Sequence, residues 1–115
     1  MADDKPILNM EIYNELSSLM GEELHELYEE FKQNTPDLMK RLEKELGYSD
    51  AKPAEATAHL LKSSSSNLGI ESFAKSCAEI EQNCKLSEID EAKKAFTLLV
   101  EEYNNFSSYN FDIAC

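Results

Sequence analysis

The stretch that decides the fold is EELHELYEEFKQNTPDLMKRLEKEL, residues 22–46. Its apolar residues recur at steps of three and four, which predicts an amphipathic helix with one core-facing stripe; they are Leu24, Leu27, Tyr28, Phe31, Leu38, Met39, Leu42 and Leu46. Pro36 interrupts the stripe, and Thr35 before it could cap a new helix. The segment is therefore either one kinked helix or two abutting ones, and Gly47 ends it.

Capping residues mark the ends of the neighbouring helices. Asn9 can cap a short first helix over about 10–20, because its side chain suits the exposed N–H groups of a first turn. A third long segment begins at a cap on Ser49 or Asp50. It stops at Asn67-Leu68-Gly69, where glycine suits the left-handed position just past a helix end.

Two more helices complete the chain. One is expected over about 71–84, and Ser87-Glu88-Ile89-Asp90 resembles a capping box that opens the last one. Few glycines and prolines and no alternating apolar pattern predict an all-α fold. Short connections favour an up-down antiparallel four-helix bundle with a short additional N-terminal helix. We expect a single domain over 1–115 with its core at about 22–106, and disorder of the Asn/Ser-rich tail, about 107–115, is left open.

Length, charge and cysteine content limit the function. The chain has 115 residues, enough for one domain but not for a separate ATP-binding domain. A net charge of −12, from 23 acidic and 11 basic residues, argues against binding to nucleic acid or to a membrane. No apolar run reaches the roughly 20 residues of a membrane span, and no signal peptide is recognised, which predicts a cytoplasmic protein. Three cysteines form no metal-binding pattern, and Cys77 and Cys84 are predicted to be buried.

The third helix carries a histidine in distinctive surroundings. One residue in five of this chain is acidic, so fifteen positions would hold about three, yet Ala56 to Ile70 holds none and its one charged side chain is Lys62. Helical spacing places four residues on the face of His59: Glu55, Lys62, Ser63 and Ser66. We therefore expect an exposed imidazole in mildly cationic surroundings, available as a nucleophile at neutral pH.

The motif H-x-x-K, followed by small residues and N-L-G, resembles the histidine-containing phosphotransfer (HPt) domains of multistep phosphorelays. The family pattern is approximately A-H-x-L-K-G-S-[SA]-x-x-[LV]-G, and residues 58–69 read AHLLKSSSSNLG. The resemblance covers about 22–106, with F-x-x-x-x-P-x-L at Phe31 to Leu38 and C-x-x-I-E at Cys77 to Glu81. The family usually has glycine where this chain has Ser63.

The resemblance implies a phosphoryl carrier and not an enzyme. His59 would accept a phosphoryl group from the aspartate of one receiver domain and pass it to another, the expected partners being the receivers of a hybrid sensor kinase and of a response regulator. Lys62 would stabilise charge and Ser63 would leave clearance, while three residues would lie near the phosphate or the partner: Ser66, Leu60 and Glu55. No metal or cofactor is expected on this chain, because Mg²⁺ belongs to the receiver. A monomer is expected.

Other interpretations explain less of the sequence. A helical interaction scaffold without phosphotransfer stays open. His25, flanked by Glu22, Glu26 and Glu29, is interpreted as part of a solvated face, because a di-iron bundle needs a second Glu-x-x-His and further core glutamates. The histidine helix of a sensor kinase would carry an acidic residue where this chain has Leu60.

Overall fold

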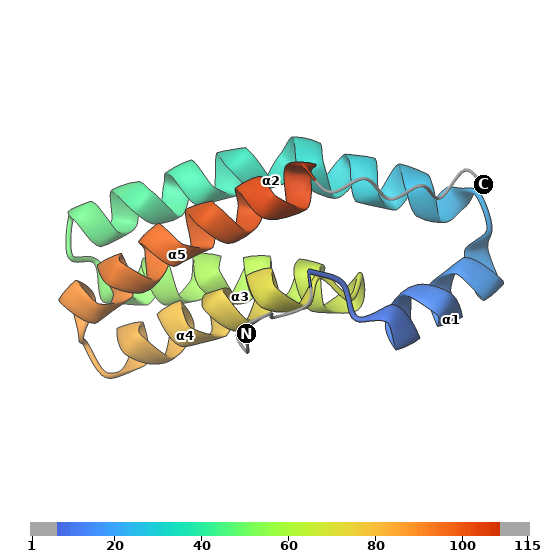
Figure 1. Ribbon diagram of the computed structural model, residues 1–115. Coiled ribbons are helices and arrows are strands. Elements are labelled where there is room, and N and C mark those ends of the chain that lie inside the picture. Colours follow the sequence, from blue (N-terminus) through green and yellow to red (C-terminus); the bar gives the residue numbers. More distant parts are fainter. Residues whose placement is uncertain (1–6, 109–115) are drawn as a thin grey trace.

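The structure is a computed structural model that describes residues 7–108. Five helices make up this part of the chain (Figure 1): α1 Met10–Met20, α2 Glu23–Gly47, α3 Ala51–Asn67, α4 Glu71–Lys85 and α5 Ile89–Ser108. Extended pairing within these residues is limited to one isolated bridge, between Leu8 and Ile70. The predicted all-α class is confirmed. Residues 107 and 108 of the predicted tail belong to α5, and 109–115 lie outside the described residues.

The four longer helices lie side by side, and the chain reverses direction from each one to the next (Figure 1). Helix α3 packs against α2 and α4, and α5 packs against α4 and α2, so the four surround a shared core. Helix α1 contacts α2 and lies at the end of the molecule where α2 begins and α3 finishes. Helices α3 and α4 share the most extensive contact, which sets the relative position of the residues discussed below.

Helix α2 continues without a break through Pro36, which settles the alternative left open by the sequence. A proline has no N–H to donate to the carbonyl four residues earlier, which here belongs to Lys32. That carbonyl instead accepts a hydrogen bond of 2.8 Å from the Tyr103 hydroxyl of α5. A side chain distant in sequence thus replaces the bond that Pro36 cannot make. Burial raises the pKa of this tyrosine.

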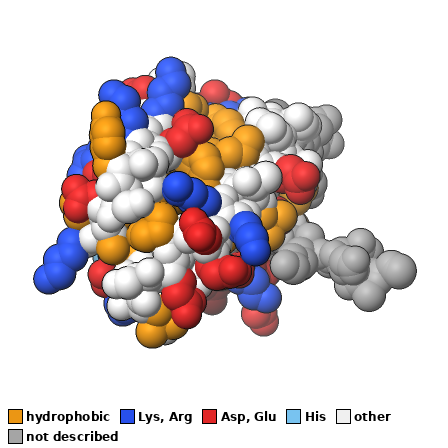
Figure 2. Space-filling view, turned by 90° about the vertical axis from the view of Figure 1, so that its left-hand side faces the viewer, with side chains coloured by type: hydrophobic (Ala, Val, Ile, Leu, Met, Phe, Trp, Pro, Cys, Tyr) orange, Lys and Arg blue, Asp and Glu red, His pale blue; other side chains and the backbone are white. Residues whose placement is uncertain are grey.

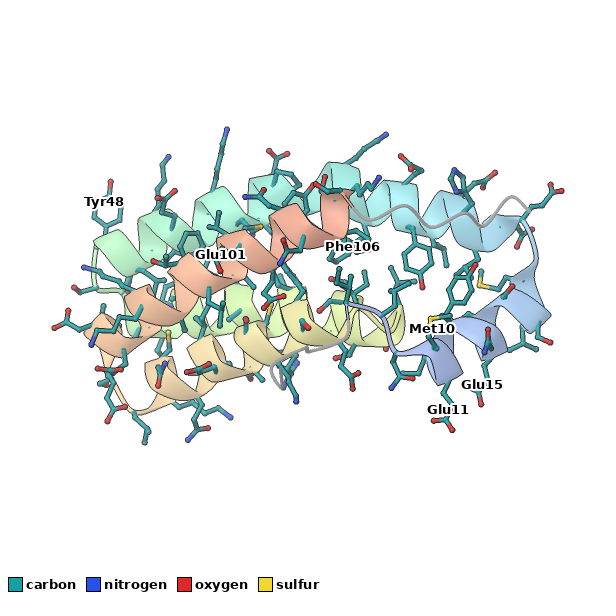
Figure 3. All side chains as sticks on the ribbon, in the orientation of Figure 1. Met10, Glu11, Glu15, Tyr48, Glu101 and Phe106 are labelled. Atoms are coloured by element: carbon teal, nitrogen blue, oxygen red, sulfur yellow. The ribbon has the colours of Figure 1, made fainter. Side chains whose placement is uncertain are left out.

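Aromatic side chains fill the centre of the core. The Phe31 ring meets Phe73 edge-on, with centroids 5.5 Å apart, and meets Phe106 in the same way at 5.3 Å. Figure 3 shows Phe106 pointing from α5 into the interior, whereas Tyr48, after α2, projects into solvent. Such edge-to-face pairs add about 0.5–1.5 kcal/mol each beyond the area they bury. The core therefore fixes α2, α4 and α5 against one another.

Cys77 and Cys84 are buried, as predicted. Burial raises the pKa of both thiols, so each is held as a neutral apolar group. They belong to the α4 surface that faces the core.

The predicted capping box was wrong. Ser87 has a left-handed backbone with φ 58°, and its N–H donates to the carbonyl of Cys84, so this residue closes α4. The first turn of α5 is anchored one residue later, where the carbonyl of Glu88 accepts from Ala92 N–H. Helices α4 and α5 are joined by a very short turn. Ser87 therefore occupies the left-handed position at the end of α4 and cannot also cap the start of α5.

At the end of α2, too, a serine predicted as a helix cap takes the left-handed position after the preceding helix. Gly47 is the last helical residue, and the left-handed position falls on Ser49, with φ 55°. Asp50 then precedes α3 without a side-chain capping bond. The prediction for Asn9 was correct, since its side chain accepts from Ile12 N–H at 3.1 Å.

The residues before α1 are bound to the turn between α3 and α4. Asn9 N–H donates to the carbonyl of Gly69 at 2.7 Å, and Glu71 N–H donates to the carbonyl of Ile7 at 3.0 Å. Gly69 has φ 72°, and a Cβ there would lie 3.0 Å from the Ile12 side chain, so both backbone conformation and space favour glycine. These contacts fix the end of α3.

Acidic and basic side chains alternate on the opposite end of the molecule. Figure 2 views the end where α2 joins α3 and α4 joins α5, and it shows Lys and Arg interspersed with Asp and Glu around small apolar patches. The net negative charge is therefore not gathered into one acidic patch on that end.

Candidate functional site

Helix α3 buries one face and exposes the other. The buried residues recur at helical spacing and are Ala54, Thr57, Ala58, Leu61 and Ser65. His59 lies beside this stripe, and 56 % of its side chain is exposed. The imidazole is thus at the surface, which agrees with the prediction. The packed stripe beneath it holds α3 against α2 and α4.

The prediction of mildly cationic surroundings for His59 left out a carboxylate that comes from another helix. Nδ1 of the ring lies 3.0 Å from Oε2 of Glu81, which comes from α4. The stretch without carboxylates, Ala56 to Ile70, belongs to α3 and the turn after it. Helix α4 packs directly beside α3 and can supply a carboxylate of its own. A signal was present in the sequence, since Glu81 is the last residue of the C-x-x-I-E motif.

The second oxygen of Glu81 binds Lys62. Lys62 Nζ lies 2.9 Å from Oε1, so one carboxylate joins two residues of α3 that are a turn apart. We call His59, Glu81 and Lys62 the charge cluster. Only 11 % of the Glu81 side chain is exposed. Burial raises its pKa, but the hydrogen bonds and positive charges of Lys62 and His59 outweigh burial, and the pKa lies below its usual 4.5.

The charge cluster fixes the tautomer of the neutral ring. An ionised carboxylate only accepts hydrogen bonds, so its contact with the imidazole places the proton on Nδ1. The lone pair of a neutral His59 is then on Nε2. An exposed ring held in one tautomer can act as a nucleophile through that atom. The arrangement is suited to forming a covalent bond at Nε2 with an incoming group.

The four serines after Lys62 differ in what their hydroxyls bind. Ser64 Oγ donates to the carbonyl of Leu61 at 3.2 Å, and the buried Ser65 Oγ donates to the same carbonyl at 2.7 Å. Ser63 and Ser66 are exposed, and within residues 7–108 their hydroxyls make no hydrogen bond. Two hydroxyls on the His59 face are therefore free to bind another group.

The other predicted contact residues belong to α3, on either side of His59 along the helix. Leu60 is 49 % exposed and forms an apolar spot directly after His59, while Glu55 is half-buried one turn before it. Ser66 borders a small hollow of about 120 Å³ that Asn9 and the turn at Gly69 also line. The structure thus unites His59 with Lys62 through Glu81, a residue that the sequence prediction missed.

His25 lies on the exposed side of α2, apart from the charge cluster. It borders an open hollow that several glutamates also line: Glu23, Glu26, Glu29 and Glu30. Across residues 7–108 no three His, Cys, Asp or Glu side chains are grouped so that they could hold a metal ion. None of the described helices combines the length and apolar character of a membrane span.

Comparisons with known proteins identify the family. No curated protein sequence matches this chain. The crystal structure of histidine-containing phosphotransfer protein B (HptB) from Pseudomonas aeruginosa PAO1 matches it with a TM-score of 0.83 and 26 % identity, over 88 % of each chain. The family model of the Hpt domain matches residues 26–109, which include all of α3 and α4 and hence the charge cluster. The chain therefore belongs to the Hpt domain family.

Proposed function

We propose that this protein is a phosphorelay intermediate in which His59 carries the phosphoryl group. Membership of the Hpt family supports a role in phosphotransfer in general. One observation carries the assignment to this residue: the 3.0 Å contact between Nδ1 and the Glu81 carboxylate, on a ring that is 56 % exposed. That contact leaves Nε2 as the basic nitrogen of the neutral ring.

In the proposed reaction Nε2 attacks the phosphorus of an aspartyl phosphate on a receiver domain. An N–P bond forms while the P–O bond to the aspartate breaks, and the aspartate leaves as a carboxylate with the electron pair. The ring keeps its Nδ1 proton and becomes a phosphorylated imidazolium, whose positive charge lies next to Glu81. Transfer to a second receiver is the same step in reverse, so neither water nor an external base is needed.

The charge cluster supports both directions of transfer. Glu81 stabilises the imidazolium, and Lys62 lies one turn from the ring with a positive charge that can offset part of the phosphoryl charge. Phosphoryl transfer depends mainly on positioning and on charge neutralisation. We assign Mg²⁺ to the receiver and no cofactor to this chain, which acts as a carrier and not as an ATP-dependent enzyme.

We propose that the receiver docks over the exposed side of α3. Ser63 and Ser66 are small and leave room beside the ring, Leu60 offers an apolar contact, and Glu55 lies at the margin. The proposed partners are the receivers of a hybrid sensor kinase and of a response regulator in the cytoplasm. The carrier is proposed to be a monomer. In this proposal α2 to α5 form an up-down antiparallel four-helix bundle, a rigid support to which α1 is added.

Transfer from a phosphorylated receiver tests the proposal. A receiver domain charged with acetyl phosphate and Mg²⁺ is mixed with the protein, and the product is mapped by mass spectrometry. We expect acid-labile, alkali-stable phosphate on His59, and no label from ATP without a kinase. Wild-type protein that stays unlabelled with every receiver of the source organism would instead support an interaction scaffold.

A further inference from the structure

Ser63 lies one helical turn after His59 on the same exposed face of α3. Residues four apart in a helix have Cβ atoms about 5–6 Å apart. A phosphoryl group on Nε2 extends beyond the ring, so its oxygens come within reach of a side chain at this distance. Ser66 lies seven residues after His59, which is a rise of roughly 10 Å, and is too far along the helix for the same contact.

Three donors of α3 that follow His59 already have partners. Lys62 is held by Glu81 at 2.9 Å, so its charge is partly neutralised before any phosphoryl group arrives. The hydroxyls of Ser64 and Ser65 donate to the carbonyl of Leu61 within their own helix. Among the described residues, the Ser63 hydroxyl is therefore the nearest donor on this face that makes no other hydrogen bond.

A phosphoryl group on His59 adds negative charge next to Glu81. At neutral pH it carries between one and two negative charges, close to the carboxylate of Glu81 and one turn from Glu55. A hydroxyl that donates to a phosphoryl oxygen lowers the free energy of the phosphorylated state without adding charge. This gain is absent from the unphosphorylated state, in which the hydroxyl faces water.

We propose that the Ser63 hydroxyl donates a hydrogen bond to the phosphoryl group on His59 and shifts the transfer equilibrium toward this protein. The inference rests on the proposed function and adds a residue that sets how much phosphoryl group the carrier holds. It concerns the position where the chain departs from the glycine of the family pattern. A glycine there would leave clearance but supply no donor.

The equilibrium constant of transfer separates a hydroxyl contact from clearance. If Ser63 only leaves room for the receiver to dock, replacing it changes the forward and reverse rates of transfer by the same factor and leaves the equilibrium constant unchanged. If its hydroxyl binds the phosphoryl group, the bond exists only in the phosphorylated state, and replacing it changes the equilibrium constant. Phosphorylated receiver is mixed with wild-type protein, Ser63→Ala, Ser63→Thr or Ser64→Ala, and the ratio of phosphohistidine to aspartyl phosphate is measured at equilibrium. The ³¹P resonance of the phosphohistidine is recorded for each protein.

We expect Ser63→Ala to lower the ratio about fivefold, as for the loss of one hydrogen bond, and to shift the ³¹P resonance. Ser63→Thr keeps the hydroxyl and Ser64→Ala removes one that donates within the helix, so both should stay within about twofold of wild type. Equal ratios in all four proteins would overturn this inference alone. Wild-type protein that accepts no phosphoryl group would overturn the proposed function as well.

Discussion

The two histidines of this protein are both exposed residues on long helices, but their surroundings differ. His59 of α3 contacts Glu81 of the neighbouring helix α4, which fixes its protonated nitrogen. His25 of α2 borders an open hollow whose other lining comes mainly from residues of the same helix. The comparison shows that exposure alone does not prepare an imidazole for reaction. A second helix must supply the group that orients it.

The charges around the two rings also differ. At His59 the carboxylate of Glu81 is matched by Lys62 at 2.9 Å. At His25 the hollow is lined by four glutamates, Glu23, Glu26, Glu29 and Glu30. A phosphoryl group on His25 would meet like charges, whereas one on His59, although close to Glu81, would also meet a lysine and a free hydroxyl.

Replacing each histidine by alanine gives the largest expected contrast. His59→Ala should reduce labelling by a phosphorylated receiver to background, since the nucleophile is lost, and His25→Ala should leave labelling within about twofold. Because both side chains are exposed, each variant should unfold within a few degrees of wild type. Labelling of His59→Ala at the wild-type rate would show that the phosphoryl group is carried elsewhere.

Removing the carboxylate of Glu81 should make His59 more like His25. We expect Glu81→Ala to slow transfer on the order of tenfold to a hundredfold, by analogy with the loss found when a residue that orients a metal-binding histidine is removed. Glu81→Gln keeps an acceptor for Nδ1–H but not the charge, so it should be slowed less. Rapid-quench kinetics measure the rates.

The exposed Glu79, on the same helix, provides the matched control for this comparison. Glu79→Ala should transfer at the wild-type rate. If Glu81→Ala did so too, the Nδ1 contact would have no part in the reaction.

Lys62→Ala should have a smaller effect, a slowing of severalfold. Its positive charge is shared with Glu81 and a third of its side chain is exposed, so solvent already screens part of it. Lys75→Ala, an exposed lysine of α4, serves as the control and should transfer normally. An unchanged rate for Lys62→Ala would mean that the receiver alone neutralises the phosphoryl charge.

Local features of the sequence were sufficient to predict the helices and the exposure of His59. Ala58, Leu61 and Ser65 form a buried stripe on α3, and His59 lies outside this stripe. Helical periodicity, which is read from neighbours along the chain, is enough to predict this. The contact with Glu81 could not be predicted in this way. It depends on how α4 is aligned against α3, which is set by the packing of the whole core.

The same limit explains the results at Pro36 and Ser87. Pro36 is compatible with a continuous helix because Tyr103, far along the chain, donates to the carbonyl of Lys32. Ser87 fits a capping pattern, but the short turn between α4 and α5 requires a left-handed residue at that place. In both cases a neighbouring helix decides between alternatives that a short stretch of sequence leaves open.

A dependence of stability on pH is the smallest effect expected from the contrast between the histidines. The folded pKa of Glu81 lies below 4.5, near which the unfolded chain titrates, so folding favours its ionised form. The stabilisation this provides is complete above that pH and is lost as the pH falls through the folded pKa. Glu81→Gln cannot titrate, so the difference in Tm between wild type and this variant should shrink as the pH falls from about 5 to 3.

Ser64→Ala, which changes no titratable group, should differ from wild type by the same amount throughout this range. The comparison then isolates the carboxylate. A difference between wild type and Glu81→Gln that did not change with pH would mean that folding does not favour an ionised Glu81. Glu81 would still be ionised at neutral pH and could still accept from Nδ1 of His59, but its contacts with His59 and Lys62 would add nothing to the stability of the folded protein.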